Sequence, residues 1–268
     1  MYSLDTTTTL RLVQITDTHL NGPEDGHLLG MKTLHSMNCV LDIVRSEQPR
    51  MDAILVSGDL AQDGSIRAYQ HLHNALSGFH CPVFWFEGNH DNPDNLQQVA
   101  AGTEHLQRVI RTPHWQLILL NSQVVGSVYG HLAADQLQLL EHTLQERPDL
   151  HTLVSFHHHP LSMGSRWIDT IGLHNADELL AIVRRHTNVR CVLWGHVHQE
   201  SEQIIDGVRY LSTPSTCVQF MPGSDDFAID TLAPGYRWLD LHPDGRVDTG
   251  VSRVEDIAFD IDYSVKGY

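Results

Sequence analysis

Six short apolar segments, separated by longer amphipathic stretches, constrain the fold of this 268-residue chain more than any other feature. The segments are rich in β-branched and aromatic residues, and their hydrophobic residues are continuous instead of alternating with polar ones. That pattern is typical of β-strands buried on both faces of a sheet. We expect these strands at residues 10–15, 52–57, 82–87, 115–121, 152–156 and 190–194.

Amphipathic helices are predicted between the strands, at residues 33–47, 65–78, 133–147 and 175–186. Within 133–147, Leu137, Leu140 and Leu144 are spaced by three and four residues, so they form one apolar stripe. Asn175 is a candidate N-cap for the last helix, which carries acids in its first turn and basic residues in its last.

The pattern changes after residue 199, where two hairpins are predicted around Asp206-Gly207 and around a Pro-Asp-Gly turn at 243–245. Strand–helix units followed by antiparallel strands indicate an α/β (α+β) fold with two packed sheets flanked by helices. We expect one domain over residues 1–268, with a core at about 10–250 and a C-terminal tail at 251–268 extended over the surface.

The formal net charge of −16 argues against a nucleic-acid-binding protein, which needs a positive surface. It permits a small anionic substrate, because bound cations can reverse the field inside a cleft. The four cysteines form no C-x-x-C pair and fit a reducing compartment. The N-terminus does not resemble a signal peptide, and no apolar run is long enough to span a bilayer. We therefore expect a soluble cytoplasmic protein with no membrane partner.

The predicted strands share one further property: five of them end in residues that can bind metal. In open α/β sheets, binding sites form at the carboxyl ends of the strands. Glycine precedes three of these groups, where it allows a close approach of the backbone. The strand-end residues are Asp17, His19, Asp59, Asn89, His90, His157, His196 and His198.

This residue set predicts a site for two metal ions. Two ions that keep positions open for water and substrate need about eight protein contacts, and paired hydrolytic metals lie roughly 3.5–4 Å apart. Seven of the residues supply eight contacts if one carboxylate bridges, and Asp59 is the candidate because Asp17 shares its turn with His19. Imidazole, carboxylate and amide ligands without thiolate favour Fe, Mn, Zn or Co.

The order D-x-H, G-D, G-N-H-D, H, G-H-x-H resembles that of the calcineurin-like metallophosphoesterase family. The similarity extends from about Leu12 to about Gly245. Longer motifs of the chain resemble those of one branch of the family, the bacterial class III 3′,5′-cyclic-AMP phosphodiesterases. These motifs are "QITDTHL", "GDLAQD", "AYQHL", "GNHD", "HHHPL", "GHVHQE", "TPSTCVQF" and "APGYR".

The resemblance implies a four-layer αββα sandwich of two mixed sheets flanked by helices. It also implies a role for each strand-end residue, with His90 and Asp59 catalytic and His90 acting on the substrate phosphate as general acid or transition-state stabiliser. The first metal would be held by Asp17, His19, Asp59 and His198. The second would be held by Asp59, Asn89, His157 and His196. The implied substrate contacts are His19, Asp59, Asn89, His90 and His198.

The implied activity is hydrolysis of 3′,5′-cyclic AMP to 5′-AMP by a hydroxide activated by the two metals, which would lower cellular cyclic AMP. Iron or manganese is the implied metal, with zinc or cobalt as alternatives, and a homodimer is left open. The alternative function is a broader phosphodiesterase of the same family, acting on glycerophosphodiesters, 2′,3′-cyclic nucleotides or nucleotides.

Some neighbouring residues keep more than one interpretation. If the strand continues past His157, its alternation predicts that His158 points to the opposite side and that His159 returns toward the cleft as a support for a ligand or a substrate contact. Asp91 or Asp63 could orient the ring of His90. Arg166 and Trp167 could cover the nucleotide base, although a surface loop fits them equally well, and the segment "TPSTCVQF" could form a pocket wall near the nucleotide or an ordinary strand and turn.

Overall fold

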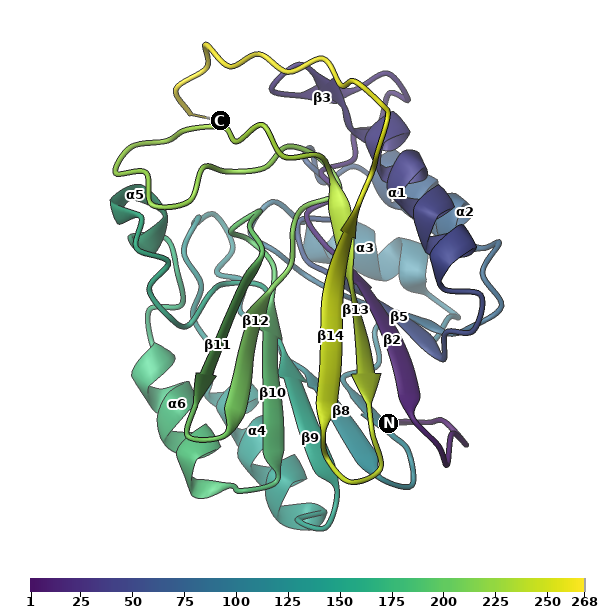
Figure 1. Cartoon of the computed structure of the whole chain (residues 1–268), viewed down its shortest axis with the longest axis vertical. Coiled ribbons are helices and arrows are strands. Elements are labelled where there is room, and N and C mark those ends of the chain that lie inside the picture. Colours follow the sequence, from purple (N-terminus) through teal and green to yellow (C-terminus); the bar gives the residue numbers. More distant parts are fainter. Residues whose placement is uncertain (268) are drawn as a thin grey trace.

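The computed structural model describes residues 1–267. Within them the chain forms a seven-stranded and a five-stranded sheet that pack face to face, with helices outside (Figure 1). The seven-stranded sheet has the order β1 (Tyr2–Ser3), β7 (Val109–Arg111), β8 (Trp115–Leu119), β9 (His151–Ser155), β10 (Val189–Trp194), β12 (Val208–Ser212), β11 (Ser201–Ile205). The five-stranded sheet has the order β14 (Val247–Arg253), β13 (Gly235–Leu241), β2 (Leu10–Ile15), β5 (Ala53–Ser57), β6 (Val83–Phe86).

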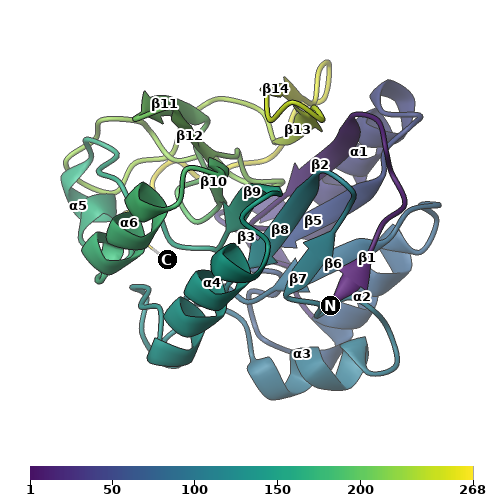
Figure 2. The same cartoon turned by 90° about the horizontal axis from the view of Figure 1, so that it is seen from below.

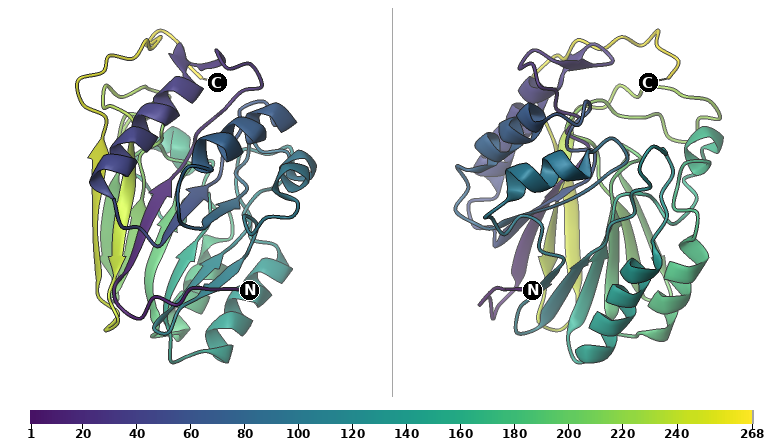
Figure 3. Two further views of the ribbon diagram at one scale, coloured as in Figure 1. Left: turned by 90° about the vertical axis from the view of Figure 1, so that its right-hand side faces the viewer. Right: turned by 180° about the vertical axis from the view of Figure 1, so that it is seen from behind.

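Helices cover the outer face of each sheet, so the molecule has the four αββα layers expected from the sequence. Figures 2 and 3 show one group of helices outside each sheet. The five-stranded sheet carries α1 (Thr33–Glu47), α2 (Ile66–Leu76) and α3 (Pro93–Ala100). The seven-stranded sheet carries α4 (Ala134–Glu146), α5 (Arg166–Asp169) and α6 (Ala176–Arg185).

The continuous apolar runs are explained by burial on both faces. In β5, Leu55 lies between the two sheets while Val56 packs under the helices of its own sheet. In β10, Leu193 lies between the sheets and Trp194 faces the helices on the other side. Successive strand residues point to opposite faces, so both faces need apolar side chains. This double burial confirms the prediction made from the sequence.

Strand direction brings the carboxyl ends of both sheets to one edge. Strands β2, β5 and β6 are parallel to one another, as are β8, β9, β10 and β12. The two hairpins predicted near the C-terminus are present as β11–β12 and β13–β14. The chain also contains elements that the sequence pattern did not predict: β1, the hairpin of β3 (His27–Leu28) and β4 (Met31–Lys32), β7, α3 and α5.

Asn175 stands at the N-cap position of α6, but its side chain makes no capping hydrogen bond. Its Oδ1 instead accepts from the backbone N of Leu132, and its Nδ2 donates to the Leu132 carbonyl. The residue thus fastens the start of α6 to the segment that leads into α4. In the tail, the backbone N of Asp262 donates to the carbonyl of Leu29, which ties it to the β3–β4 hairpin.

Leu193→Ala is expected to lower the free energy of unfolding by about 2–5 kcal/mol, because it leaves a cavity in the layer between the sheets. Leu193 is fully buried there. The control Leu232→Ala, at a residue 49% exposed, is expected to change stability by less than about 0.5 kcal/mol. Urea denaturation of both variants measures the difference; equal losses would contradict the assignment of this layer as core.

Candidate metal centre

The candidate metal centre lies where five strands of the two sheets end. Asp17 is the second residue after β2, and Asp59 is the second residue after β5. Asn89 follows β6. β9 and β10 of the other sheet are followed in the same way by His157 and His196. Adjacent loops are joined by backbone hydrogen bonds, from Asp17 N to the Gly58 carbonyl and from His19 N to the Asp59 carbonyl. The structure thus brings together residues that are up to 181 positions apart.

Most of these residues have a strained backbone. The described part of the chain has eight non-glycine residues with positive φ, and five of them belong to the predicted ligand set: Asp17, His19, Asp59, His196 and His198. For such residues this conformation costs of the order of 1–3 kcal/mol each and is concentrated at functional sites. The tight turns direct the side chains inward at the sheet edge, which supports a functional origin of the strain.

One half of the centre is formed by Asp17, His19 and His198, whose side chains are fully buried. The Oδ1 of Asp17 lies 3.2 Å from Nε2 of His198. The Nε2 atoms of His19 and His198 are also 3.2 Å apart. Both oxygens of Asp17 accept from the backbone N of His196, which orients the carboxylate.

The other half is centred on Asp59. Its Oδ2 lies 3.2 Å from Nε2 of His157 and 3.8 Å from Nε2 of His19. Its Oδ1 accepts from the backbone N of His90 at 2.9 Å. One oxygen of Asp59 is therefore held by a backbone amide, while the other faces a histidine from each half of the centre.

The second ring nitrogen of three histidines is engaged by a backbone carbonyl. Nδ1 of His157 donates to the Ser57 carbonyl and Nδ1 of His198 donates to the Val218 carbonyl, at 2.9 and 2.8 Å. His196 uses the opposite nitrogen, donating from Nε2 to the Ile171 carbonyl. In the neutral tautomer the remaining nitrogens carry lone pairs. This orientation of imidazoles by carbonyls is usual around protein-bound metals.

The charge pattern fits cations. Lone pairs of His19 and His198 face each other and face carboxylate oxygens, an arrangement that is repulsive without a positive charge between them. Burial lowers the pKa of His19 to about 3, so its imidazole stays neutral and able to bind metal. Although burial opposes its charging, the carboxylates of Asp59 and Asp17 raise the pKa of His157 to about 9. Either a proton or a metal ion can therefore balance these carboxylates.

Buried atoms without partners give a second indication. Among the described residues, Oδ1 of Asn89 is buried and lacks a hydrogen-bond partner, as do Nε2 of His158 and Nδ1 of His159 nearby. Leaving such atoms unsatisfied costs about 1–3 kcal/mol each, whereas metal coordination would satisfy Oδ1 of Asn89. The donor set of the seven predicted ligands therefore fits the two metal ions that the sequence predicts.

Glycines keep the motifs close together. A Cβ on Gly195 would lie 2.1 Å from Oγ1 of Thr16 and 2.7 Å from Oδ2 of Asp17, and a Cβ on Gly58 would lie 2.2 Å from Nδ1 of His157. The glycines predicted to allow a close approach thus make room for side chains of the neighbouring motif.

Gly195→Ala is expected to displace Asp17 and to lower both metal content and catalytic activity by about 10–100-fold, the range seen when support for a metal ligand is lost. Gly78→Ala is the matched control, since a Cβ there meets nothing within 4 Å. Elemental analysis and turnover of both variants provide the measurement. An alanine at 195 that leaves metal content unchanged would contradict the packing described here.

The three consecutive histidines all approach the centre. The prediction that His158 points away from the site is wrong, because β9 ends at Ser155 and strand alternation ends with it. The ring of His158 lies 4.7 Å from that of His196, and its Nδ1 bonds Oγ of Ser122. His159 does return to the site, where its ring stacks on His196 at 5.7 Å.

The two acids considered for orienting His90, Asp91 and Asp63, both accept hydrogen bonds from backbone groups. Both oxygens of Asp91 accept backbone N–H groups, from Leu60, Ala61 and Gly88, and Tyr69 donates its hydroxyl to the same carboxylate. Asp63 accepts from the backbone of Gly22 and Ser65. Burial, with the nearby charge of Asp59, raises the pKa of Asp91 to about 7. Asp91 thus fastens the loops after β5 and β6 together.

Three residues near the centre were not predicted from the sequence. Oε1 of Gln62 lies 2.6 Å from Nδ1 of His19 and orients that ring. Ser122 holds His158 as described above. Sγ of Cys217 lies close to the nitrogens of His19 and His198, but burial raises the pKa of its thiol to about 12 and keeps it protonated. Gln62 and Cys217 lie within the motifs "GDLAQD" and "TPSTCVQF", but the motifs alone assign no role to either side chain, and Ser122 lies in none of the quoted motifs.

The chain is similar to known proteins over most of its length. The model of the calcineurin-like phosphoesterase family matches residues 10–200. This chain belongs to that family. The membership confirms the resemblance stated from the sequence motifs, and the family implies two metal ions. No helix within residues 1–267 combines the length and apolar character needed to cross a membrane.

Relatives extend the similarity over nearly the whole chain. The 3′,5′-cyclic adenosine monophosphate phosphodiesterase CpdA of Pseudomonas aeruginosa is 46% identical over 96% of this chain and 94% of the relative. The protein of the same name from Escherichia coli K12 is 43% identical over 97% and 95%. Among solved structures, a dimetal phosphatase from Danio rerio shares the fold with a TM-score of 0.62 and 17% identity, covering 92% of this chain and 100% of that chain.

Proposed function

We propose that this phosphoesterase hydrolyses 3′,5′-cyclic AMP to 5′-AMP and so lowers cellular cyclic AMP. The observation that carries the proposal is the identity of 46% with a cyclic-AMP phosphodiesterase over 96% of the chain, which contains the whole candidate centre. The converging residues of the two sheets would hold the metal ions, which provide the positive charge that the oxygens of a phosphodiester need.

We assign the ligands as the resemblance implies. Asp17, His19 and His198 hold one metal ion and Asn89, His157 and His196 hold the other, with Asp59 bridging them. The bridge is supported by Oδ2 of Asp59, which lies 3.2 Å from Nε2 of His157 and 3.8 Å from Nε2 of His19. The mixture of imidazole, carboxylate and amide donors favours iron or manganese, with zinc or cobalt as alternatives.

When bound, the two ions neutralise charge on the phosphoryl group and activate the attacking water. The protein residues hold the reacting groups in place. His90 stands at the cavity beside Asn89 and donates a proton to the departing 3′ oxygen of the ribose. Its backbone N–H fixes Asp59, so the acid and the bridging carboxylate are positioned together.

We further propose that the whole chain acts as one catalytic unit in the cytoplasm. The four cysteines are free and three of them are buried, which suits a reducing compartment. The net charge of −16 favours a small nucleotide over a nucleic-acid polymer as the substrate.

Turnover of three substrates by the manganese-loaded enzyme tests the proposal: 3′,5′-cyclic AMP, 2′,3′-cyclic AMP and a bis-aryl phosphate. The expected result is a higher kcat/KM for 3′,5′-cyclic AMP than for the other two. Equal or faster hydrolysis of 2′,3′-cyclic AMP would indicate the broader phosphodiesterase instead. No hydrolysis of 3′,5′-cyclic AMP with manganese or iron present would overturn the proposal.

A further inference from the structure

An aromatic cavity opens directly beside the candidate metal centre. It has a volume of about 210 Å³. Three of the residues that line it, Asn89, His90 and His196, belong to the candidate centre. The rest of its lining is apolar and is formed by Val128, Trp167, Ile171, Phe220, Phe227 and Gly267. A ligand in this cavity would therefore have a charged group at the metals and an apolar group among the aromatic rings.

The aromatic walls form a defined cluster. The ring of Trp167 lies edge-to-face against Phe220 and Phe227, with both centroid distances 5.2 Å. The rings of Phe220 and Phe227 are 5.5 Å apart. These separations are within the range of favourable aromatic pairs, so the rings hold one another in position.

Contacts to the candidate ligands fix the cluster relative to the metals. The ring of Phe220 stacks on that of His198 at 4.1 Å and 12°. The carbonyl of Ile171 accepts from Nε2 of His196. Arg166 does not cover the cavity: its guanidinium pairs with Asp225 at 2.7 Å, which ties α5 to the loop that carries Phe227. Trp167 is thus the member of this pair that lines the cavity.

We infer that this aromatic cavity binds the purine base of the nucleotide, an inference that rests on the proposed function. A cavity of about 150 Å³ accommodates benzene, so a slightly larger one suits a two-ring heterocycle. Aromatic side chains bind bases by stacking on their flat faces. Stacking contributes to the binding free energy without any hydrogen bond to the edges of the base. Trp167 and Phe227 then determine affinity for the base, while the residues at the other end bind the phosphate.

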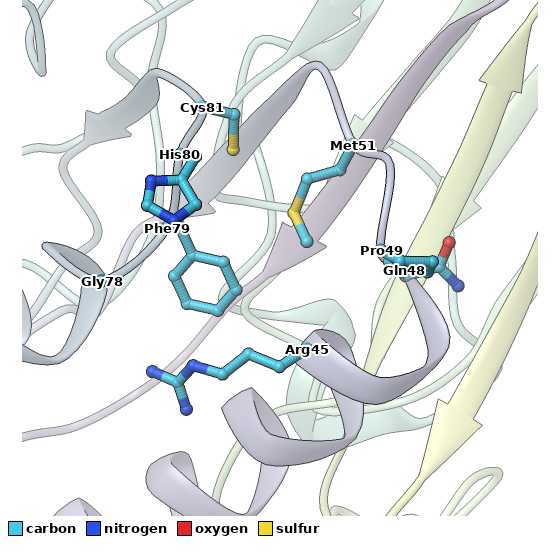
Figure 4. A pocket seen from close by; sticks show the side chains of 8 residues that line it. All are labelled: Arg45, Gln48, Pro49, Met51, Gly78, Phe79, His80 and Cys81. Carbon is cyan, nitrogen blue, oxygen red and sulfur yellow. The ribbon is translucent and has the colours of Figure 1, made fainter.

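Another apolar cavity serves as a comparison. It has a volume of about 190 Å³ and lies between the end of α1 and the loop before β6, where the guanidinium of Arg45 stands 4.8 Å from the ring of Phe79 (Figure 4). None of the described residues that line it belongs to the candidate metal centre. Phe79 thus lines a cavity that is separate from the candidate metal centre, and Phe79→Ala is a control for the aromatic substitutions.

The test compares inhibition of cyclic-AMP turnover by 5′-AMP and by ribose 5-phosphate, which lacks the base. Trp167→Ala and Phe227→Ala, in the manganese-loaded full chain, are expected to raise Ki for 5′-AMP roughly 5–100-fold, from the stacking energy of one base. Ki for ribose 5-phosphate should stay unchanged, and KM for cyclic AMP should rise more than kcat falls. Trp167→Phe should restore most of the affinity, and Phe79→Ala should behave as wild type.

Two results would overturn the inference while leaving the proposed function intact. One is an unchanged Ki for 5′-AMP in both alanine variants. The other is an equal loss of affinity for 5′-AMP and for ribose 5-phosphate, which would mean that the aromatic residues contribute to phosphate binding or to folding and not to base binding. A wild-type enzyme that does not hydrolyse cyclic AMP would instead refute the proposed function itself.

Discussion

Asp59→Ala is expected to remove bound metal and cyclic-AMP hydrolysis together. The carboxylate is buried, and its Oδ2 faces histidines from both halves of the centre. Losing a residue that merely supports a ligand costs about 10–100-fold in metal affinity or activity, and loss of the bridge itself should exceed that range. Elemental analysis of the purified variant and its turnover of cyclic AMP provide the two readouts.

The control for this variant is Asp42→Ala, because the Asp42 side chain is 75% exposed on α1 and pairs with Arg45 in the same helix. It should keep wild-type metal content and activity, since exposed ion pairs contribute little. An Asp59→Ala enzyme that retains two tightly bound ions would rule out the bridging role, even if its activity were lost.

His90→Ala is expected to retain its metals and lose most turnover. The backbone N–H that fixes Asp59 survives the substitution, so the ligand set stays in place. Loss of a positioned general acid lowers kcat by about 10²–10⁴-fold. The measurement is kcat for cyclic AMP together with metal content, and His142→Ala, at an exposed position on α4, is the control.

Two results would count against the role of His90. A variant with the wild-type rate would exclude it from the chemistry. A variant that loses metal as well as rate would make His90 part of the metal site and not an acid acting on the leaving group.

The sequence predicts the location of the centre well because strand ends are encoded locally. Each of the five runs is buried on both faces, and the first polar residues after it must emerge at the edge of the sheet. Asp17, Asp59 and His157 illustrate this, since each follows its strand by two residues. The hairpins were equally predictable, because Asp206-Gly207 specifies a tight turn within a few residues.

Other features depend on contacts between distant segments, which no local pattern encodes. The orientation of His158 depends on where β9 ends and on Ser122, which is 36 positions away. Asp91 could be noticed beside His90, but its true partners are backbone amides of another loop. The aromatic cavity is a further case: the sequence offered Trp167 as a possible contact of the base, but its partner Phe227 comes from a distant segment and meets it only in the folded chain.

The most direct test of the account is a titration of metal-free protein with manganese, followed by metal stoichiometry and by turnover of 3′,5′-cyclic AMP. We expect two ions bound per chain, activity that appears only as they bind, and 5′-AMP as the product. Cyclic-AMP hydrolysis by the metal-free protein at the same rate, or fully loaded protein that leaves cyclic AMP intact, would contradict it.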